Sequence, residues 1–453
     1  MRYFRIIFIF CFLIGIQLVS EAQVAISIEL EGNQDTTFYL AYYHGDKFRM
    51  IDTTETISGK AVFRREESYP EGVYILTNKA KNRLTEFLLG SDQKFTLKIP
   101  SEQSNAIIEC EGALETCLFF EHLNLTQKVY SRLKELNAKD ALSEVEKTGL
   151  RKDLEAKIWV YRDSIIIAHP QLFISNLFLA MKEPVVPDSI AANQNEAYFY
   201  YKDHFWDTFD LKDDRLIRTP LLVNKIKLFF DKVVLQIPDS IAVEIDKVIA
   251  KTGTNTEMRD FLLWQFMDMY QNPKFMGMDK VFVHLSDTYF SKLDIAYMTP
   301  SVQKSITDRA DVLRKLLLGS YAPNLILVDT TDALLSLMDV NSEYTVVFFW
   351  DPDCGVCKKE LKELKALYDS KKYPMEVFAV ASNPDFDKWK KIIREQQLDW
   401  INVNGMKSAT ADFHDLYDIA STPVIYVLDK QKRIIGKKIQ ANQVGVIIDN
   451  FYQ

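Results

Sequence analysis

The sequence predicts a multidomain protein with a small all-β domain near the N-terminus, an all-α domain in the centre and an α/β domain at the C-terminus. The chain has 453 residues, which is enough for about three domains of ordinary size. Its hydrophobic pattern changes from short alternating runs to helical spacing, and then to strands separated by helices. We place these three domains at residues 23–112, 113–320 and 321–453.

Residues 1–22 have the layout of a cleaved signal peptide. Arg2 and Arg5 form a positively charged N-terminal region, which an apolar run over residues 6–16 follows. Ala22 lies at the expected cleavage point. The apolar run is short for a membrane span of about 20 residues. We therefore expect export and cleavage, with an uncleaved membrane anchor as the alternative.

The segment after the signal peptide has the pattern of an all-β domain. Short runs that alternate apolar and polar residues, or that are rich in β-prone residues, are separated by turns. The predicted strands are 24–30, 37–43, 61–63, 73–76 and 95–99. Such a series indicates a small sandwich or barrel.

The central segment changes to helical spacing, and prolines interrupt it, since proline cannot continue a helix interior. The clearest predicted helices are 226–234, 240–250, 257–270 and 302–318. The segment from 321 onward then alternates strands with helices, as an α/β sheet requires. Its predicted strands are 345–350, 376–381, 424–428 and 434–439.

Cys354 and Cys357 form a CxxC motif that follows the strand 345–350 directly and opens a helix. A helix N-terminus carries unpaired N–H groups and a partial positive charge, which favour a thiolate at Cys354. The thiolate is the form that attacks disulfides. Cys357, one turn later, can then attack the resulting mixed disulfide and release the partner.

A CxxC motif can also be half of a structural zinc site, which needs two more thiolate or imidazole ligands. Cys110 and Cys117 lie far upstream, and His414 is isolated in the sequence. We therefore expect neither a metal nor a cofactor.

The C-terminal segment resembles the thioredoxin superfamily, most closely the exported TlpA/ResA-type thiol–disulfide oxidoreductases. The similar motifs are the opening Ala322–Leu325, the line "VVFFWDPDCGVCKKEL" and the loop Ser421–Pro423. The β-domain and the helical segment ahead of it resemble the arrangement in envelope thioredoxin-like proteins of Gram-negative bacteria, through "VAISIELEG" and "MIDTTETISGKAVF".

This resemblance implies roles for four more residues. Trp350 stands at the family's aromatic position and is a candidate substrate-binding residue. Thr422 and Pro423 belong to a loop with a cis-proline that helps to bind extended substrate. Glu360 stands where the reductase subgroup has a glutamate that modulates thiol ionisation. An exposed helix charge is the alternative for Glu360. The buried aspartate of thioredoxin is replaced here by Phe348.

Cys110 and Cys117 lie at the junction of the β and helical segments. Because export permits disulfides, they are candidates for a structural disulfide. Two buried thiols are the alternative, and a second redox pair is less favoured because the segment has no CxxC.

These observations predict an exported dithiol–disulfide oxidoreductase of the periplasm or cell envelope. Its expected partners are envelope proteins with disulfides and a membrane electron donor. The net charge of −8 and the lack of a basic run argue against nucleic acid. Two alternatives stay open: an envelope partner-binding protein with an accessory redox domain, and a peroxidase of the peroxiredoxin type.

Overall fold

The structure, a computed structural model, describes residues 23–31, 36–57, 59–100, 107–137, 143–382 and 385–451. The predicted signal peptide lies outside these residues. The chain forms two compact units, Met1–Lys227 and Leu228–Gln453. Their boundary lies inside the predicted helical domain, so the helical segment is shared between the units.

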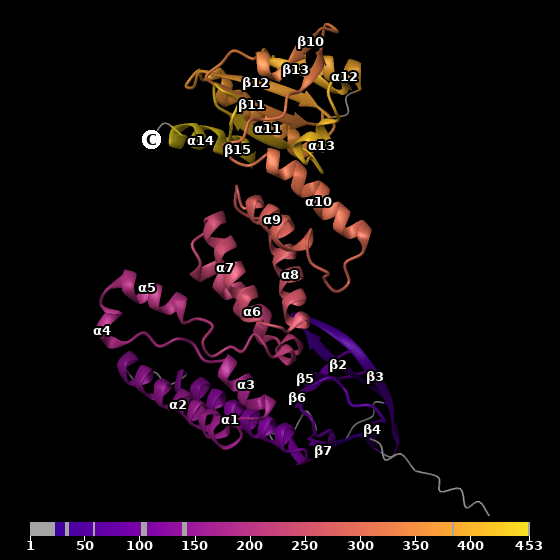
Figure 1. Ribbon diagram of the computed structural model, residues 1–453, viewed down its shortest axis with the longest axis vertical. Helices are drawn as coiled ribbons and strands as arrows, with labels where there is room; N and C mark the ends of the chain where they lie inside the picture. The colour runs from indigo at the N-terminus through magenta and orange to yellow at the C-terminus, as the bar shows by residue number, and fades with distance from the viewer. Residues whose placement is uncertain are drawn as a thin grey trace, which may run out of the picture. The chain divides into compact units, whose positions relative to one another are not determined.

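The first unit contains one sheet of eight strands in the order β6-β5-β2-β3-β4-β1-β7-β8 (Figure 1). The strands are β1 (Val24–Leu30), β2 (Thr37–His44), β3 (Lys47–Ile57), β4 (Lys60–Arg65), β5 (Gly72–Asn78), β6 (Arg83–Leu89), β7 (Lys94–Ile99) and β8 (Glu109–Gly112). In β1, Ile26 lies opposite Phe63 on one side and Phe95 on the other, and all three side chains are buried.

Strand β3 connects the two halves of this sheet. Its residues 47–55 pair with β2, and residues 56–57 pair with β4. Phe63 of β4 and Phe87 of β6, from opposite halves, belong to one buried cluster. The sheet therefore curves around a shared core, as expected for a small barrel or sandwich.

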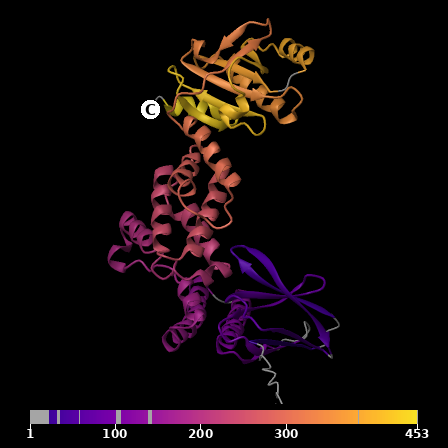
Figure 2. The ribbon, with the colours of Figure 1, turned by 45° about the vertical axis from the view of Figure 1, so that its right-hand side comes forward.

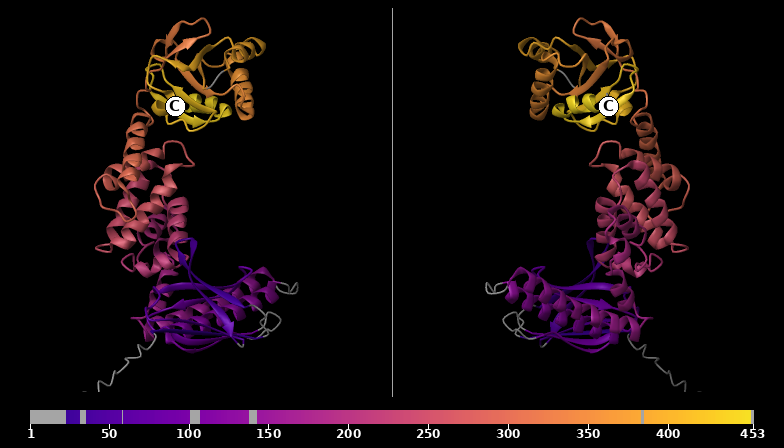
Figure 3. Two further views of the ribbon diagram at one scale, coloured as in Figure 1. Left: turned by 90° about the vertical axis from the view of Figure 1, so that its right-hand side faces the viewer. Right: turned by 90° about the vertical axis from the view of Figure 1, so that its left-hand side faces the viewer.

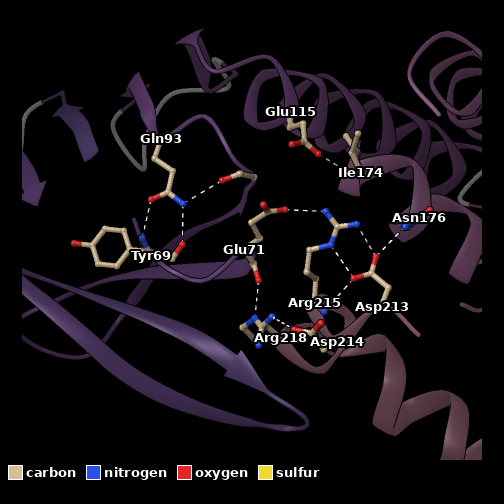
Figure 4. Close-up of polar contacts among 11 residues, drawn as sticks. Tyr69, Glu71, Gln93, Glu115, Ile174, Asn176, Asp213, Asp214, Arg215 and Arg218 are labelled. Atoms are coloured by element: carbon tan, nitrogen blue, oxygen red, sulfur yellow. Dashed lines mark hydrogen bonds and ion pairs between the residues drawn. The ribbon is translucent and has the colours of Figure 1, made fainter. Parts of the chain in front are cut away.

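The helices of the first unit are α1 (Leu114–Asn137), α2 (Glu144–Ala168), α3 (Phe173–Ala180), α4 (Asp188–Ala191), α5 (Gln194–Asp203), η1 (Asp214–Arg218) and α6 (Leu221–Leu228), which ends one residue beyond the unit. Charged side chains join η1 to Glu71, the residue before β5 (Figure 4). Arg215 of η1 donates to Glu71 at 2.8 Å and to Asp213, and Arg218 donates to the backbone oxygen of Glu71 at 2.7 Å. These bonds explain why this part of the helical segment belongs with the β-domain.

The second unit begins with helices that lead directly into an α/β sheet (Figure 2). The helical elements are η2 (Phe229–Val233), α7 (Pro238–Lys251), α8 (Thr256–Gln271), α9 (Asp279–Leu285), η3 (Ser286–Phe290) and α10 (Pro300–Lys315). The sheet has the strand order β10-β9-β13-β12-β11-β14-β15.

The elements of this α/β part are β9 (Ile326–Asp329), β10 (Leu334–Ser336), η4 (Leu337–Asp339), β11 (Tyr344–Trp350), α11 (Gly355–Asp369), β12 (Met375–Ala381), α12 (Phe386–Glu395), β13 (Ile401–Ser408), α13 (Phe413–Tyr417), β14 (Val424–Leu428), β15 (Ile434–Ile439), η5 (Ala441–Gln443) and α14 (Val444–Phe451). Strands β11, β12 and β13 are parallel, and β14 is antiparallel to β11. The predicted order of β, α and α/β segments is thus confirmed.

The central strand β11 is buried on both faces because helices cover both sides of the sheet (Figure 3). Val346, Phe348 and Trp350 face a cluster formed with α11, α12 and α14. Val347 and Phe349 face a second cluster that contains side chains of α13. A strand with two covered faces is a continuous apolar run, as the sequence shows.

A buried ion pair fixes the helices of the second unit to its sheet. The Lys437 ammonium of β15 contacts the Asp279 carboxylate of α9 and donates to the backbone oxygen of Leu316 at 2.5 Å. Both charged side chains are at least nine-tenths buried. Helices α9 and α10 therefore hold a defined position beside β15.

Candidate active site

Cys354 is the N-cap residue of α11, between the end of β11 and the first helical turn. Its Sγ accepts a hydrogen bond from the backbone N–H of Cys357 at 3.2 Å. The sequence predicted this placement, and the N–H group is one of the unpaired donors that begin a helix. A thiolate at Cys354 would be stabilised by the same donor.

The two cysteines differ in their access to solvent. Both are free thiols, but Cys354 is half-buried whereas Cys357 has no exposed surface. Burial raises the pKa of the Cys357 thiol to about 11, although its Sγ accepts a hydrogen bond from Asp351 N–H at 3.5 Å. Cys354 is thus the thiol that a partner can reach. Cys357 lies deeper in the core, and its raised pKa keeps it protonated at neutral pH.

The loop with Thr422 and Pro423 faces Cys354. The peptide bond between these two residues is cis, as the resemblance implies. The carbonyl oxygen of Thr422 lies 3.9 Å from Sγ of Cys354. Pro423 lines a cleft of about 590 Å³ together with Val356, the residue between the cysteines. The structure therefore brings the CxxC motif and the predicted substrate loop together.

Trp350 lies beneath this site rather than at its surface. Only 1% of Trp350 is exposed, and its ring stacks on Phe348 with centroids 6.2 Å apart. This burial corrects the expectation that Trp350 contacts substrate, because the side chain has no accessible surface through which to do so. It packs in the core that supports Cys357.

Glu360 is buried on α11, with 7% of its surface exposed. Its Oε2 accepts a hydrogen bond from the backbone N–H of Ala441 at 2.6 Å. The alternative of an exposed helix charge is therefore wrong. The carboxylate joins α11 to η5, and a role in thiol ionisation stays a prediction.

Two aspartates flank the cysteines, and the structure adds a lysine that the sequence did not indicate. Asp351 Oδ1 accepts a hydrogen bond from Asp353 N–H at 2.7 Å. The Asp353 carboxylate contacts the ammonium group of Lys388 on α12. Lys388 offsets part of the negative charge near Cys354. Because Lys388 lies far from the CxxC motif in the sequence, the motif alone could not predict this contact.

The cleft beside Cys354 also contains residues from the helical segment. Besides Val356, Glu360 and Pro423, its lining includes Arg309 of α10 together with Asp418 and Lys438. Arg309 Nε lies 3.2 Å from Asp418 Oδ1, and Lys438 Nζ lies 2.6 Å from Asp418 Oδ2. No sequence pattern indicated this group, because Arg309 has the spacing of a solvent-facing residue on an ordinary amphipathic helix.

Cys110 and Cys117 form a disulfide that joins β8 to α1. This pairing excludes the alternative of two buried thiols, and a structural role for the disulfide stays a prediction. In the described ranges, no group of three or more histidine, cysteine, aspartate or glutamate side chains could hold a metal ion. No helix among the described residues has the length and apolar character of a membrane span.

Three family models match successive parts of the chain. Residues 24–115 match a domain of unknown function, DUF4369, and residues 132–313 match another, DUF5106. Residues 318–437 match the AhpC/TSA family. No curated protein matches the chain.

Several solved structures from bacteria are similar to parts of the chain. A thioredoxin-like protein from Bacteroides caccae is 19% identical, with a TM-score of 0.49 over 59% of this chain and 98% of its own. A domain of a possible thiol-disulfide isomerase from Cytophaga hutchinsonii is 38% identical over 30% of this chain and 93% of its own, with a TM-score of 0.28. The thioredoxin domain of a thiol-disulfide oxidoreductase from Bacteroides vulgatus is 27% identical over 30% and 98%, with a TM-score of 0.28. The part of the chain that contains Cys354 and Cys357 is thus a thioredoxin-like domain that matches the AhpC/TSA family.

Proposed function

We propose that the protein is an exported dithiol–disulfide oxidoreductase that reduces disulfides of cell-envelope proteins through Cys354 and Cys357. The observation that supports this most is the asymmetry of the two thiols. Cys354 is accessible at the N-terminus of α11 beside Thr422, whereas Cys357 is buried one turn along. A nucleophile and a resolving thiol need this arrangement.

The reaction has two exchange steps. The Cys354 thiolate attacks one sulfur of the partner's disulfide, and the partner's other sulfur leaves as a thiolate and takes up a proton. Cys357 then loses its proton and attacks Cys354 Sγ, which releases the first partner sulfur as a thiol. Two electrons and two protons pass to the partner, and Cys354 and Cys357 become a disulfide. A dithiol donor at the membrane would reduce them again.

Other residues of the site assist these steps. Thr422 and Pro423 bind the extended segment of the partner next to its disulfide. Glu360 lies three residues after Cys357 on α11, so both side chains lie on one face of the helix. We assign to Glu360 the transfer of the Cys357 proton during the second step, with water as the alternative carrier.

The test uses the full chain and the reduction of insulin disulfides with dithiothreitol as electron donor. We expect Cys354→Ser to abolish catalysed reduction. Reduced Cys357→Ser, mixed with insulin after dithiothreitol has been removed, should stop after the first step and accumulate mixed disulfides. Unchanged exchange in both variants would exclude the proposal. Binding of envelope proteins that survives both changes would favour the partner-binding alternative. Consumption of hydrogen peroxide without insulin reduction would favour the peroxidase.

A further inference from the structure

Two clefts of the second unit share part of their lining. The first, of about 590 Å³, contains Val356 and Pro423, and the second, of about 280 Å³, contains Phe275. Three residues line both clefts: Asn272, Arg309 and Lys438. The two clefts are therefore adjacent and share part of their walls; together, here called the joint groove, they extend from Val356 of the CxxC motif to the loop between α8 and α9.

The joint groove has apolar side chains at both ends. Val356, at the cysteine end, is 61% exposed. Phe275 and Met276, at the far end, are 57% and 38% exposed. Exposed apolar groups next to a reaction site are typical of a surface that binds another molecule. Because Pro423 lines the joint groove and Thr422 O lies 3.9 Å from Cys354 Sγ, a segment bound there lies next to the site where the disulfide reacts.

One wall of the joint groove is positively charged. Lys274, Arg309 and Lys438, here called the basic wall, supply three cations. Arg309 and Lys438 share a single carboxylate, Asp418, and Lys274 is exposed. The lining also contains the buried Glu360 carboxylate and the buried, balanced pair of Lys437 with Asp279. Four cations and three carboxylates line the joint groove, so it has an excess of one positive charge in a chain with a net charge of −8.

Two of the three wall residues lie outside the redox domain. Lys274 and Arg309 belong to the helical segment that matches DUF5106, within residues 132–313. The buried Lys437–Asp279 pair holds this segment against β15. The helical segment thus adds groups to the site that the redox domain itself does not contain.

From this geometry we infer that the joint groove binds the polypeptide segment next to the partner's disulfide, and that the basic wall selects a segment with a carboxylate beside an apolar residue. This inference rests on the proposed function. Complementary charge at such a surface raises specificity and the rate of encounter more than total affinity.

The test compares two disulfide peptides that differ only in flanking residues, either aspartate or lysine next to a leucine. The full reduced protein is assayed for kcat/KM on each peptide and on a small disulfide, cystamine. We expect about a threefold to tenfold preference for the acidic peptide, in the range of partly exposed charge pairs. The preference should fall in high salt, because salt screens exposed charges.

Substitutions show whether the basic wall causes this preference. Arg309→Gln and Lys274→Gln should each bring the ratio of the two peptides closer to one. The ratio cancels any general loss of active protein. Arg314→Gln is the matched control, since Arg314 lies on the same helix and pairs with Asp311 and Asp287.

The outcomes separate the inference from the proposed function. Equal kcat/KM for the two peptides in the unaltered protein would overturn the inference and leave the proposed function standing. An equal loss of preference in Arg314→Gln would also overturn the inference. Absence of exchange with both peptides and with cystamine would overturn the proposed function, and the inference with it.

Discussion

The Sγ atom of Cys354 accepts a hydrogen bond from the backbone N–H of Cys357 at 3.2 Å. This bond places the accessible sulfur against the first turn of α11, while the Cys357 side chain points into the core. The two thiols of one short motif therefore have different environments, and most of the expected behaviour of the site follows from this difference.

The first prediction concerns Cys357 and alkaline pH. Burial raises the pKa of its thiol from 9.0 to about 11 in the folded protein. The unfolded chain therefore loses this proton at lower pH, and the stability due to the neutral thiol is lost as pH rises from about 9 to 11. The free energy of unfolding of the reduced protein should fall, relative to a Cys357→Ala variant, by about 1 to 2 kcal/mol across this window. Urea unfolding at pH 8 and pH 11 measures this difference, and parallel pH dependence in both proteins would contradict it.

The second prediction concerns Glu360. Glu360→Ala leaves the buried N–H of Ala441 without its acceptor, which should lower the free energy of unfolding by about 1 to 3 kcal/mol. Glu360→Gln keeps an acceptor and should cost clearly less. Glu363→Ala is the control, because Glu363 on the same helix only approaches Lys359 at 3.9 Å. Urea unfolding measures all three variants.

The same variants test the proton transfer assigned to Glu360. Glu360→Gln cannot carry a proton, so the decay of the mixed disulfide should slow by about tenfold or more. Stopped-flow measurement of that decay should show no change in Glu363→Ala. Decay at the normal rate in Glu360→Gln would leave Glu360 as a purely structural link between α11 and η5.

The third prediction concerns the buried pair Lys437–Asp279. Lys437→Met leaves the Asp279 carboxylate buried without a counter-charge, which should cost about 3 to 5 kcal/mol of unfolding free energy. The double variant Lys437→Met with Asp279→Leu should recover much of that loss. Lys280→Met, which removes an exposed pair with Asp239, should cost less than about 1 kcal/mol. A Lys437→Met variant as stable as the unaltered protein in urea would contradict the importance of this anchor.

The fourth prediction concerns the disulfide between Cys110 and Cys117. The bond closes a short loop, with a sequence separation of 7. Loop-closure entropy gives such a bond about 2 kcal/mol of stability. Thermal unfolding of Cys110→Ala/Cys117→Ala should show a lower Tm, with insulin reduction retained. Loss of insulin reduction in this variant would point instead to a second redox pair.

Much of the fold could be predicted from the sequence, but polar strands could not. β1 and β14 have strong apolar patterns, and their bounds match the prediction. β13 was missed because it carries Asn402, Asn404 and Gly405, which are typical of loops. The buried Asn402 amide donates to two backbone carbonyls, and a Cβ at Gly405 would lie 2.6 Å from Phe413. The hydrogen bonds of Asn402 and the close packing at Gly405 allow these residues to lie in a buried strand. Both depend on the folded structure, so they cannot be predicted from local sequence.

The candidate site likewise contains residues that the sequence predicts and residues that it does not. Cys354, Cys357 and Pro423 were found because local motifs carry them, and the structure brings them together. Arg309 and Lys388 were missed, because each reaches the site from a distant helix. Their importance depends on tertiary contacts with Asp418 and Asp353, for which neither spacing nor composition gives a signal.

The most direct test of the central claim is to map the covalent complex formed by the full-length Cys357→Ser variant with a disulfide-containing protein. After proteolysis under non-reducing conditions, mass spectrometry should find one mixed disulfide, between Cys354 and a cysteine of the partner. The double variant Cys354→Ser/Cys357→Ser should form none. A complex joined through another cysteine, or one that persists in the double variant, would contradict the assignment of Cys354 as the nucleophile.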